Sequence, residues 1–225
     1  MKGNVCQSGF ELYISGFPRS GNTFAVKAFL TANPGTPLRS HKHIPTFIVQ
    51  SVKSGRPGMV LIRNPLDAAI SWSIHRRAPV GQSLQYYSDY YSVLAPYRER
   101  LFIVSFEDVV ADFGKVINGF NARWGTAYRP FENSEQNVAN CMAQIEAEYT
   151  GRDGKVNERT VARPSATRAA KKEALLSQIN SSSALRAELC RAQELYHFFP
   201  PQACAPAKPK HHPDSTQSIR LRPAT

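Results

Sequence analysis

The stretch Glu11–Thr23, ELYISGFPRSGNT, decides the fold. Its first part, ELYISG, is a short β-rich run that ends at a glycine, and the residues Asn22–Ala32 that follow carry apolar side chains at helical spacing. Between the two lies a glycine-containing loop. This order of strand, loop and helix brings backbone N–H groups and a helix N-terminus together. Many proteins bind a phosphate with such an arrangement. The stretch therefore predicts an α/β domain that begins with an anion-binding loop.

The same alternation continues along the chain. Met59–Arg63 (MVLIR) and Leu101–Phe106 (LFIVSF) are apolar runs of strand length, and we expect helices at Leu66–Arg77 and Phe113–Trp124 behind them. Strands that alternate with helices indicate a central parallel β-sheet flanked by helices.

The C-terminal part has a different pattern. From about Ser165 to Phe199 the sequence is helical in character, with an interruption at residues 180–183. Residues 200–225 are rich in proline and poor in apolar side chains, which predicts a disordered tail. We therefore expect one α/β domain over residues 1–199 with a helical C-terminal part, followed by the tail.

An excess of positive charge suggests anionic partners. The 225 residues include 28 Lys and Arg against 17 Asp and Glu, a formal net charge of +11. Residues 151–225 hold 13 basic and 6 acidic residues, so +7 of the total falls in this part. Nucleic acid, a membrane surface, an acidic polymer and a phosphorylated small molecule would all suit this charge.

Other features exclude several classes of protein. Hydrophobic residues make up 42% of the chain, which argues against wholesale disorder. No apolar run approaches the roughly 20 residues of a membrane-spanning helix, and the N-terminus lacks the apolar core of a secretory signal. The four cysteines have no CxxC spacing, which disfavours a zinc site and a disulfide framework. We expect a cytoplasmic protein without a metal site.

The loop departs from the nucleotide-binding P-loop pattern GxxxxGK[ST] at one position. Gly16, Gly21 and Thr23 match the pattern, but Asn22 stands where the lysine belongs. The cation of this loop is Arg19 instead, so the loop predicts an anion site of different geometry. An ordinary turn between a strand and a helix is the alternative interpretation.

A second anion site is predicted within the segment RNPLDAAIS, which runs from Arg63 to Ser71. Arg63 ends a predicted strand, where ligands of open α/β sheets bind. Asp67, Ser71 and His75 follow one another at i, i+4 spacing and so share one helix face. Arg63 and Ser71 can therefore bind one phosphate together. A surface ion pair between Arg63 and Asp67 is the alternative.

Together, the segments GFPRSGNTF and RNPLDAAIS resemble two motifs of the sulfotransferase family that uses 3′-phosphoadenosine-5′-phosphosulfate (PAPS). The first is similar to the family's 5′-phosphosulfate loop and the second to its 3′-phosphate motif. Ser105–Asp108 (SFED) is similar to the YED segment of the family, and Arg39–His41 (RSH) to its Lys-Thr-His. The resemblance implies a P-loop-like α/β fold and transfer of a sulfuryl group from PAPS, without a metal, to a hydroxyl or amine of a small-molecule or glycan acceptor.

The resemblance also implies which residues form the site. His41 would be the catalytic base, with His43 as the alternative, and Arg19 would contact the transferring group. The residues implied in binding the co-substrate are Arg19, Ser20, Gly21, Asn22, Thr23, Phe24, Arg63, Ser71, Phe106 and, in a degenerate C-terminal 3′-phosphate loop, Arg163 with Arg168 nearby.

Two other functions stay open. A small-molecule or nucleotide kinase with a degenerate P-loop would need ATP and magnesium. A basic nucleic-acid-binding protein would bind with a steep dependence on salt. The resemblance disfavours nucleic acid as the main partner, because PAPS is itself strongly anionic. A cluster of tyrosines is interpreted as core packing, with a wall of the acceptor pocket as the alternative; these are Tyr86, Tyr87, Tyr90, Tyr91 and Tyr97.

Overall fold

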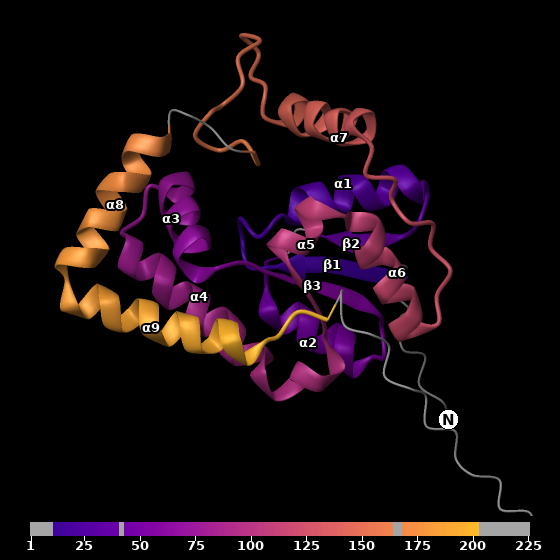
Figure 1. Cartoon of the computed structure of the whole chain (residues 1–225), viewed down its shortest axis with the longest axis horizontal. Helices are drawn as coiled ribbons and strands as arrows, with labels where there is room; N and C mark the ends of the chain where they lie inside the picture. Colours follow the sequence, from indigo (N-terminus) through magenta and orange to yellow (C-terminus); the bar gives the residue numbers. More distant parts are fainter. Residues whose placement is uncertain (1–10, 41–42, 164–167, 203–225) are drawn as a thin grey trace, which may run out of the picture.

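The apolar runs of the sequence pair into a parallel sheet (Figure 1). A computed structural model describes residues 11–40, 43–163 and 168–202. Within these ranges the sheet has the order β2-β1-β3-β4, and every neighbouring pair is parallel. The strands are β1 (Leu12–Gly16), β2 (Leu38–Ser40), β3 (Gly58–Ile62) and β4 (Phe102–Ser105).

Both faces of the sheet are covered by helices because β1, β3 and β4 are buried along their whole length and successive side chains point to opposite faces. In β3, Met59 and Leu61 belong to one buried cluster, and Val60 and Ile62 belong to the other. Figure 1 shows α1 and α7 on one side of the sheet and α2 and α9 on the other. The first face is covered by α1 (Asn22–Ala32), α5 (Phe106–Ala111), α6 (Phe113–Trp124) and α7 (Glu135–Glu148), and the second by α2 (Pro45–Lys53), α4 (Val80–Leu94) and α9 (Ser183–Phe198).

Two further helices lie beyond one end of the sheet in Figure 1, namely α3 (Pro65–Arg76) and α8 (Ala169–Ser181). Helix α3 begins directly after β3, so this is the carboxyl end of that strand. A short 3₁₀ helix, η1 (Ala95–Arg100), leads into β4. None of the described helices is long and apolar enough to span a membrane.

The sheet has a topological switch point between β1 and β3. The connection from β1 runs through α1 to β2 on one side, and the connection from β3 runs through α3 and α4 to β4 on the other. The loops that leave β1 and β3 therefore diverge, which opens a crevice at the carboxyl ends of these two strands. Ligands of open α/β sheets bind in such a crevice.

The predicted α/β class with a central parallel sheet flanked by helices is confirmed. The three expected strands agree with β1, β3 and β4 to within one residue at each end. The helical C-terminal part is present as α8 and α9, which meet at Ser182. Phe106, expected at the end of a strand, instead begins α5, because the Ser105 hydroxyl caps that helix by accepting a hydrogen bond from the Asp108 N–H at 2.9 Å.

The interpretation of the tyrosines as core residues is confirmed for three of them. Tyr87, Tyr90 and Tyr91 are at most 1% exposed and pack in the cluster that α4 forms against the sheet. Most of the expected tail, residues 203–225, lies outside the described residues. Before that point the chain is still held to the sheet, since the Gln202 N–H donates to the Ile103 carbonyl at 2.9 Å.

Candidate functional site

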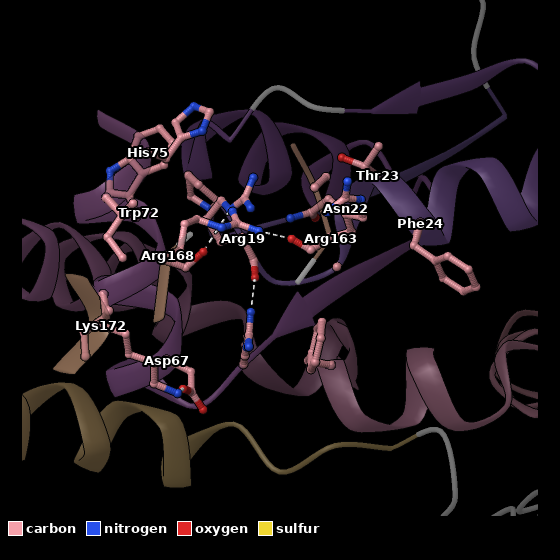
Figure 2. A pocket seen from close by; sticks show the side chains of 18 of the residues that line it. Arg19, Asn22, Thr23, Phe24, Asp67, Trp72, His75, Arg163, Arg168 and Lys172 are labelled. Carbon is pink, nitrogen blue, oxygen red and sulfur yellow. Dashed lines mark hydrogen bonds and ion pairs between the residues drawn. The ribbon is translucent and has the colours of Figure 1, made fainter. Parts of the chain in front are cut away.

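A cavity of about 530 Å³ lies at the switch point. Its wall is formed by the loop after β1 with the first turn of α1, by His43, Arg63 and one face of α3 from Asp67 to His75, and by the first residue of α5. Tyr149, residues 162–163 and the start of α8 complete it. Figure 2 shows that Trp72 and His75 of α3 lie on one side of Arg19, and that Thr23 and Phe24 of α1 lie on the other. A cavity of this size can enclose a nucleotide-sized ligand.

The loop after β1 depends on two glycines. A Cβ at Gly16 would lie 2.2 Å from the Leu61 carbonyl oxygen, so only glycine allows β1 and β3 to approach this closely. Gly21 has a φ of +85° and is the N-cap residue of α1. Helix α1 has neither a side-chain cap nor an acidic residue in its first turn, so its N-terminal dipole faces the cavity without a carboxylate of its own helix.

Asn22 takes a structural part in the loop. Its Nδ2 donates to the Phe17 carbonyl at 3.0 Å and so closes the loop on itself. Ser20 turns inward and is fully buried. The loop therefore presents one cationic side chain to the cavity, that of Arg19, which itself has a left-handed φ of 69°.

The guanidinium of Arg19 joins the loop to two distant segments. Its Nε donates to Ser71 Oγ at 3.0 Å, and its two terminal nitrogens donate to the carbonyls of Thr160 and Val161 at 3.1 and 2.8 Å. Burial lowers the pKa of Arg19 to about 10, and the positive charges of Arg168 and Arg63 add to this effect. An anion bound in the cavity would offset the repulsion between these positive charges.

Arg63 lies against the same loop. Its Nη1 donates to the Arg19 carbonyl at 3.1 Å, and its guanidinium lies 4.1 Å from the centre of the Phe106 ring. Burial lowers the pKa of Arg63, although Asp67 and Glu107 oppose the shift. The alternative surface pair of Arg63 with Asp67 does not form in the described residues, since the ion pair of Asp67 is with Lys172 at 3.0 Å.

Helix α8 and the segment before it add more cations to the cavity wall. Arg163 lines the cavity but is paired with Glu146 and, at 2.8 Å, with Glu158, and these hydrogen bonds raise its pKa. Arg168 lines the cavity as well and donates to the Val161 carbonyl at 3.2 Å. Burial lowers the pKa of Arg168, and Arg163 and Arg63 add to the effect, whereas the charge of Glu158 opposes it without reversing it. Arg168 is thus the less neutralised of the two arginines.

Two histidines line the cavity near Arg19. The Nδ1 of His43 lies 2.8 Å from the Gly16 carbonyl, and because a carbonyl can only accept, this nitrogen carries the proton. The proton-accepting lone pair is then on Nε2. The Tyr86 hydroxyl donates to the His43 carbonyl at 3.1 Å and helps to fix this residue. Burial and the charge of Arg19 lower the pKa of His43, so its ring is neutral at pH 7.

His75 stacks on Trp72, with the ring centres 5.2 Å apart. Its carbonyl accepts a hydrogen bond from Arg159. Burial and the charges of Arg19, Arg159 and Arg76 lower the pKa of His75 to about 4.

The structure brings nearly all of the predicted residues that it describes to this one cavity. Ser20 alone of the described ones lies behind its wall, and His41 lies outside the described residues. The sequence did not predict that the cavity wall also includes Trp72, Tyr149, Ala162 and Lys172. Trp72 could have been found, because it directly follows Ser71 on the predicted helix. The others come from a segment with no recognisable motif. Among the described residues no group of three or more His, Cys, Asp or Glu is arranged to hold a metal ion.

Comparisons with known proteins give one solved structure of similar fold. No protein-family model matches the sequence, and neither does any curated protein. The chain is similar to mouse sulfotransferase SULT7A1, whose crystal structure is of its complex with PAP, with 12% sequence identity over 80% of this chain and 88% of that chain and a TM-score of 0.44.

Proposed function

We propose that the protein is a sulfotransferase that moves a sulfuryl group from PAPS to a hydroxyl, or an amine, of an acceptor. One observation carries the proposal. The two segments that resemble the family's phosphate motifs are far apart in sequence, yet Arg19 of the first donates to Ser71 of the second at 3.0 Å, and Arg63 of the second donates back to the Arg19 carbonyl at 3.1 Å.

The residues of the cavity suit a nucleotide with phosphate groups at two positions. The N-terminus of α1 and Arg19 offer one group of donors, and Arg63, Ser71 and Arg168 offer a second. The lowered pKa values of these three arginines reflect buried positive charge. Bound anions would favour the charged forms and stabilise the site.

Within this proposal the nucleotide supplies the activated sulfuryl group, and the chain's own residues position and neutralise it. Arg19 stabilises negative charge that develops on the departing phosphate, and its guanidinium acts by charge alone because it keeps its proton at neutral pH. The N–H groups of the first turn of α1 add to this stabilisation.

A histidine accepts the proton of the acceptor hydroxyl. His43 is suited to this step because its Nδ1 proton is held by the Gly16 carbonyl, its basic nitrogen is therefore Nε2, and its lowered pKa keeps the ring neutral. Help of this kind contributes about 10²- to 10⁴-fold in rate. His41, two residues earlier, is the other candidate that the resemblance implies.

The experiment is calorimetric titration of the protein with adenosine 3′,5′-bisphosphate, with and without magnesium. We expect binding in both conditions, and a loss of at least about tenfold in affinity in Arg63→Ala, because hydrogen bonds to charged groups contribute about 1.5–3 kcal/mol. Arg123→Ala is the matched control, since Arg123 also donates to a backbone carbonyl but lies on the surface.

A wild-type protein that binds ATP only with magnesium and does not bind the bisphosphate would contradict the proposal and favour a kinase.

A second experiment, transfer from PAPS to a panel of hydroxyl compounds, tests which histidine is the catalytic base. His43→Ala should lose transfer while its affinity for the bisphosphate changes little. Full activity in that variant, with loss in His41→Ala, would assign the base to His41.

A further inference from the structure

Phe106 touches both of the anion-binding segments. The ring is presented by the first residue of α5, directly after β4, and it lines the cavity. A Cβ added to Gly21 would lie 3.1 Å from Phe106 Cδ2, so the ring lies directly against the loop between β1 and α1 (residues 17–21, the phosphate loop). The guanidinium of Arg63 lies over the same ring, 4.1 Å from its centre.

These contacts account for how Arg63 is held. One terminal nitrogen of the guanidinium donates to the Arg19 carbonyl at 3.1 Å, and the guanidinium carbon lies over the Phe106 ring. A cation over an aromatic face is attracted by the ring's quadrupole, and the attraction grows when the pair is shielded from water. The ring therefore holds the guanidinium in place together with the hydrogen bond to the Arg19 carbonyl.

We propose that Phe106 is a positioning residue that holds Arg63 against the phosphate loop and so sets the strength of binding at the second phosphate position. The inference rests on the proposed function, since it concerns the same nucleotide site. This role is distinct from a direct contact between the Phe106 ring and the adenine ring of the nucleotide. A contact with adenine and a contact with Arg63 make different predictions for ligands that differ only in the second phosphate.

The test compares two probes, adenosine 3′,5′-bisphosphate and adenosine 5′-monophosphate, by calorimetry. The ratio of their dissociation constants measures what the 3′-phosphate adds to binding. In Phe106→Leu an apolar side chain still packs against Gly21 but the aromatic face is lost. We expect the ratio to fall by about tenfold, equivalent to ~1.4 kcal/mol, while affinity for the monophosphate changes by less than about twofold. Phe106→Tyr keeps the ring and should keep the wild-type ratio.

A double-mutant cycle with Arg63→Ala separates positioning from a general loss of structure. Once Arg63 is absent, Phe106→Leu should leave the ratio unchanged. Phe198→Leu is the matched control, because Arg98 lies over the Phe198 ring at 4.6 Å outside the cavity. That variant removes the same kind of contact and should leave both affinities unchanged.

Two results would overturn the inference. One is an unchanged ratio in Phe106→Leu, including an equal loss of affinity for both probes, and the other is a failure of Phe106→Tyr to keep the wild-type ratio. If Phe106→Leu melts at a clearly lower temperature, Phe106→Met replaces it under the same criteria. A wild-type protein that shows no preference for the bisphosphate would instead contradict the proposed function, so the two failures are distinguishable.

Discussion

The Nε of Arg19 donates a hydrogen bond of 3.0 Å to Ser71 Oγ, across 52 residues of sequence. The bond joins the loop after β1 to the cavity face of α3. It also accounts for the presence of an arginine, and not a lysine, at this position of the loop. A guanidinium can reach Ser71 and the Thr160 and Val161 carbonyls at the same time, whereas an ammonium group cannot span three acceptors in this fork.

Ser71→Ala should weaken binding of adenosine 3′,5′-bisphosphate by about three- to tenfold, because a hydroxyl that can bond both Arg19 and an anion is lost. Calorimetry measures the change. Ser54→Ala, which removes an exposed hydroxyl bonded to the Gln50 carbonyl, is the control and should bind as the wild type does. An unchanged affinity in Ser71→Ala would mean that this hydroxyl only holds Arg19.

Arg168→Ala should weaken binding of the bisphosphate more than Arg163→Ala does. Arg163 is already neutralised by Glu146 and Glu158, so its removal takes little positive charge from the cavity. The charge of Arg168 lowers the pKa of Arg19, and the charge of Arg63 lowers the pKa of Arg168, so these three arginines lie close together. We expect about tenfold for Arg168 and less than about threefold for Arg163. The reverse order would restore the role that the sequence implied for Arg163.

The sequence predicted the core of the fold because local and global signals agree there. ELYISG and MVLIR are mostly apolar, and each is followed by a loop and a helical pattern, which suffices for two strands of a parallel sheet. It did not predict β2, because Leu38–Ser40 is only three residues long and half-exposed, so it has no periodicity to detect. That strand forms because β1 provides a partner edge, which is a tertiary effect.

Some residues of the candidate site could likewise be predicted from the sequence, and others could not. Arg19, Arg63 and Ser71 could be predicted because each belongs to a compact motif of fixed spacing. Lys172 could not, because it reaches the cavity only through the packing of α8 beside α3. The composition showed an excess of positive charge in the C-terminal part. Two of its basic residues, Arg168 and Lys172, lie on the cavity wall.

Gly21→Ala should lower the free energy of unfolding and also weaken binding of the bisphosphate. Gly21 has a left-handed φ of +85°, which is strained for alanine, and the added Cβ would lie 3.1 Å from the Phe106 ring. Gly125→Ala is the matched control, because Gly125 has a φ of +66° with no atom within 4 Å of the added Cβ. Both variants should lose about 1 kcal/mol in chemical denaturation, but only Gly21→Ala should lose affinity. Equal affinities would contradict the contact with Phe106.

His75 should make the protein less stable in mild acid. Its pKa is lowered to about 4 by burial and nearby arginines, so between pH 6.5 and 4 the unfolded chain binds a proton that the folded chain does not. The free energy of unfolding therefore falls as the pH falls through this range. Relative to His75→Gln, the wild type should lose about 1 kcal/mol between pH 7.5 and pH 5, after allowance for screening by solvent. The same fall in both proteins would show that other groups cause it.

His43 should titrate below its ordinary pKa of 6.5, because burial and the charge of Arg19 disfavour the imidazolium. ¹⁵N chemical shifts measured across pH should show a protonated Nδ1 and an unprotonated Nε2 at pH 7, since Nδ1 donates to the Gly16 carbonyl. Bound adenosine 3′,5′-bisphosphate partly neutralises Arg19 and should raise the pKa of His43. By linkage, the bisphosphate then binds more tightly as the pH falls, and His43→Gln should lose that part of the dependence. A proton on Nε2, or a pKa that the bisphosphate leaves unchanged, would remove the grounds for His43 as the base.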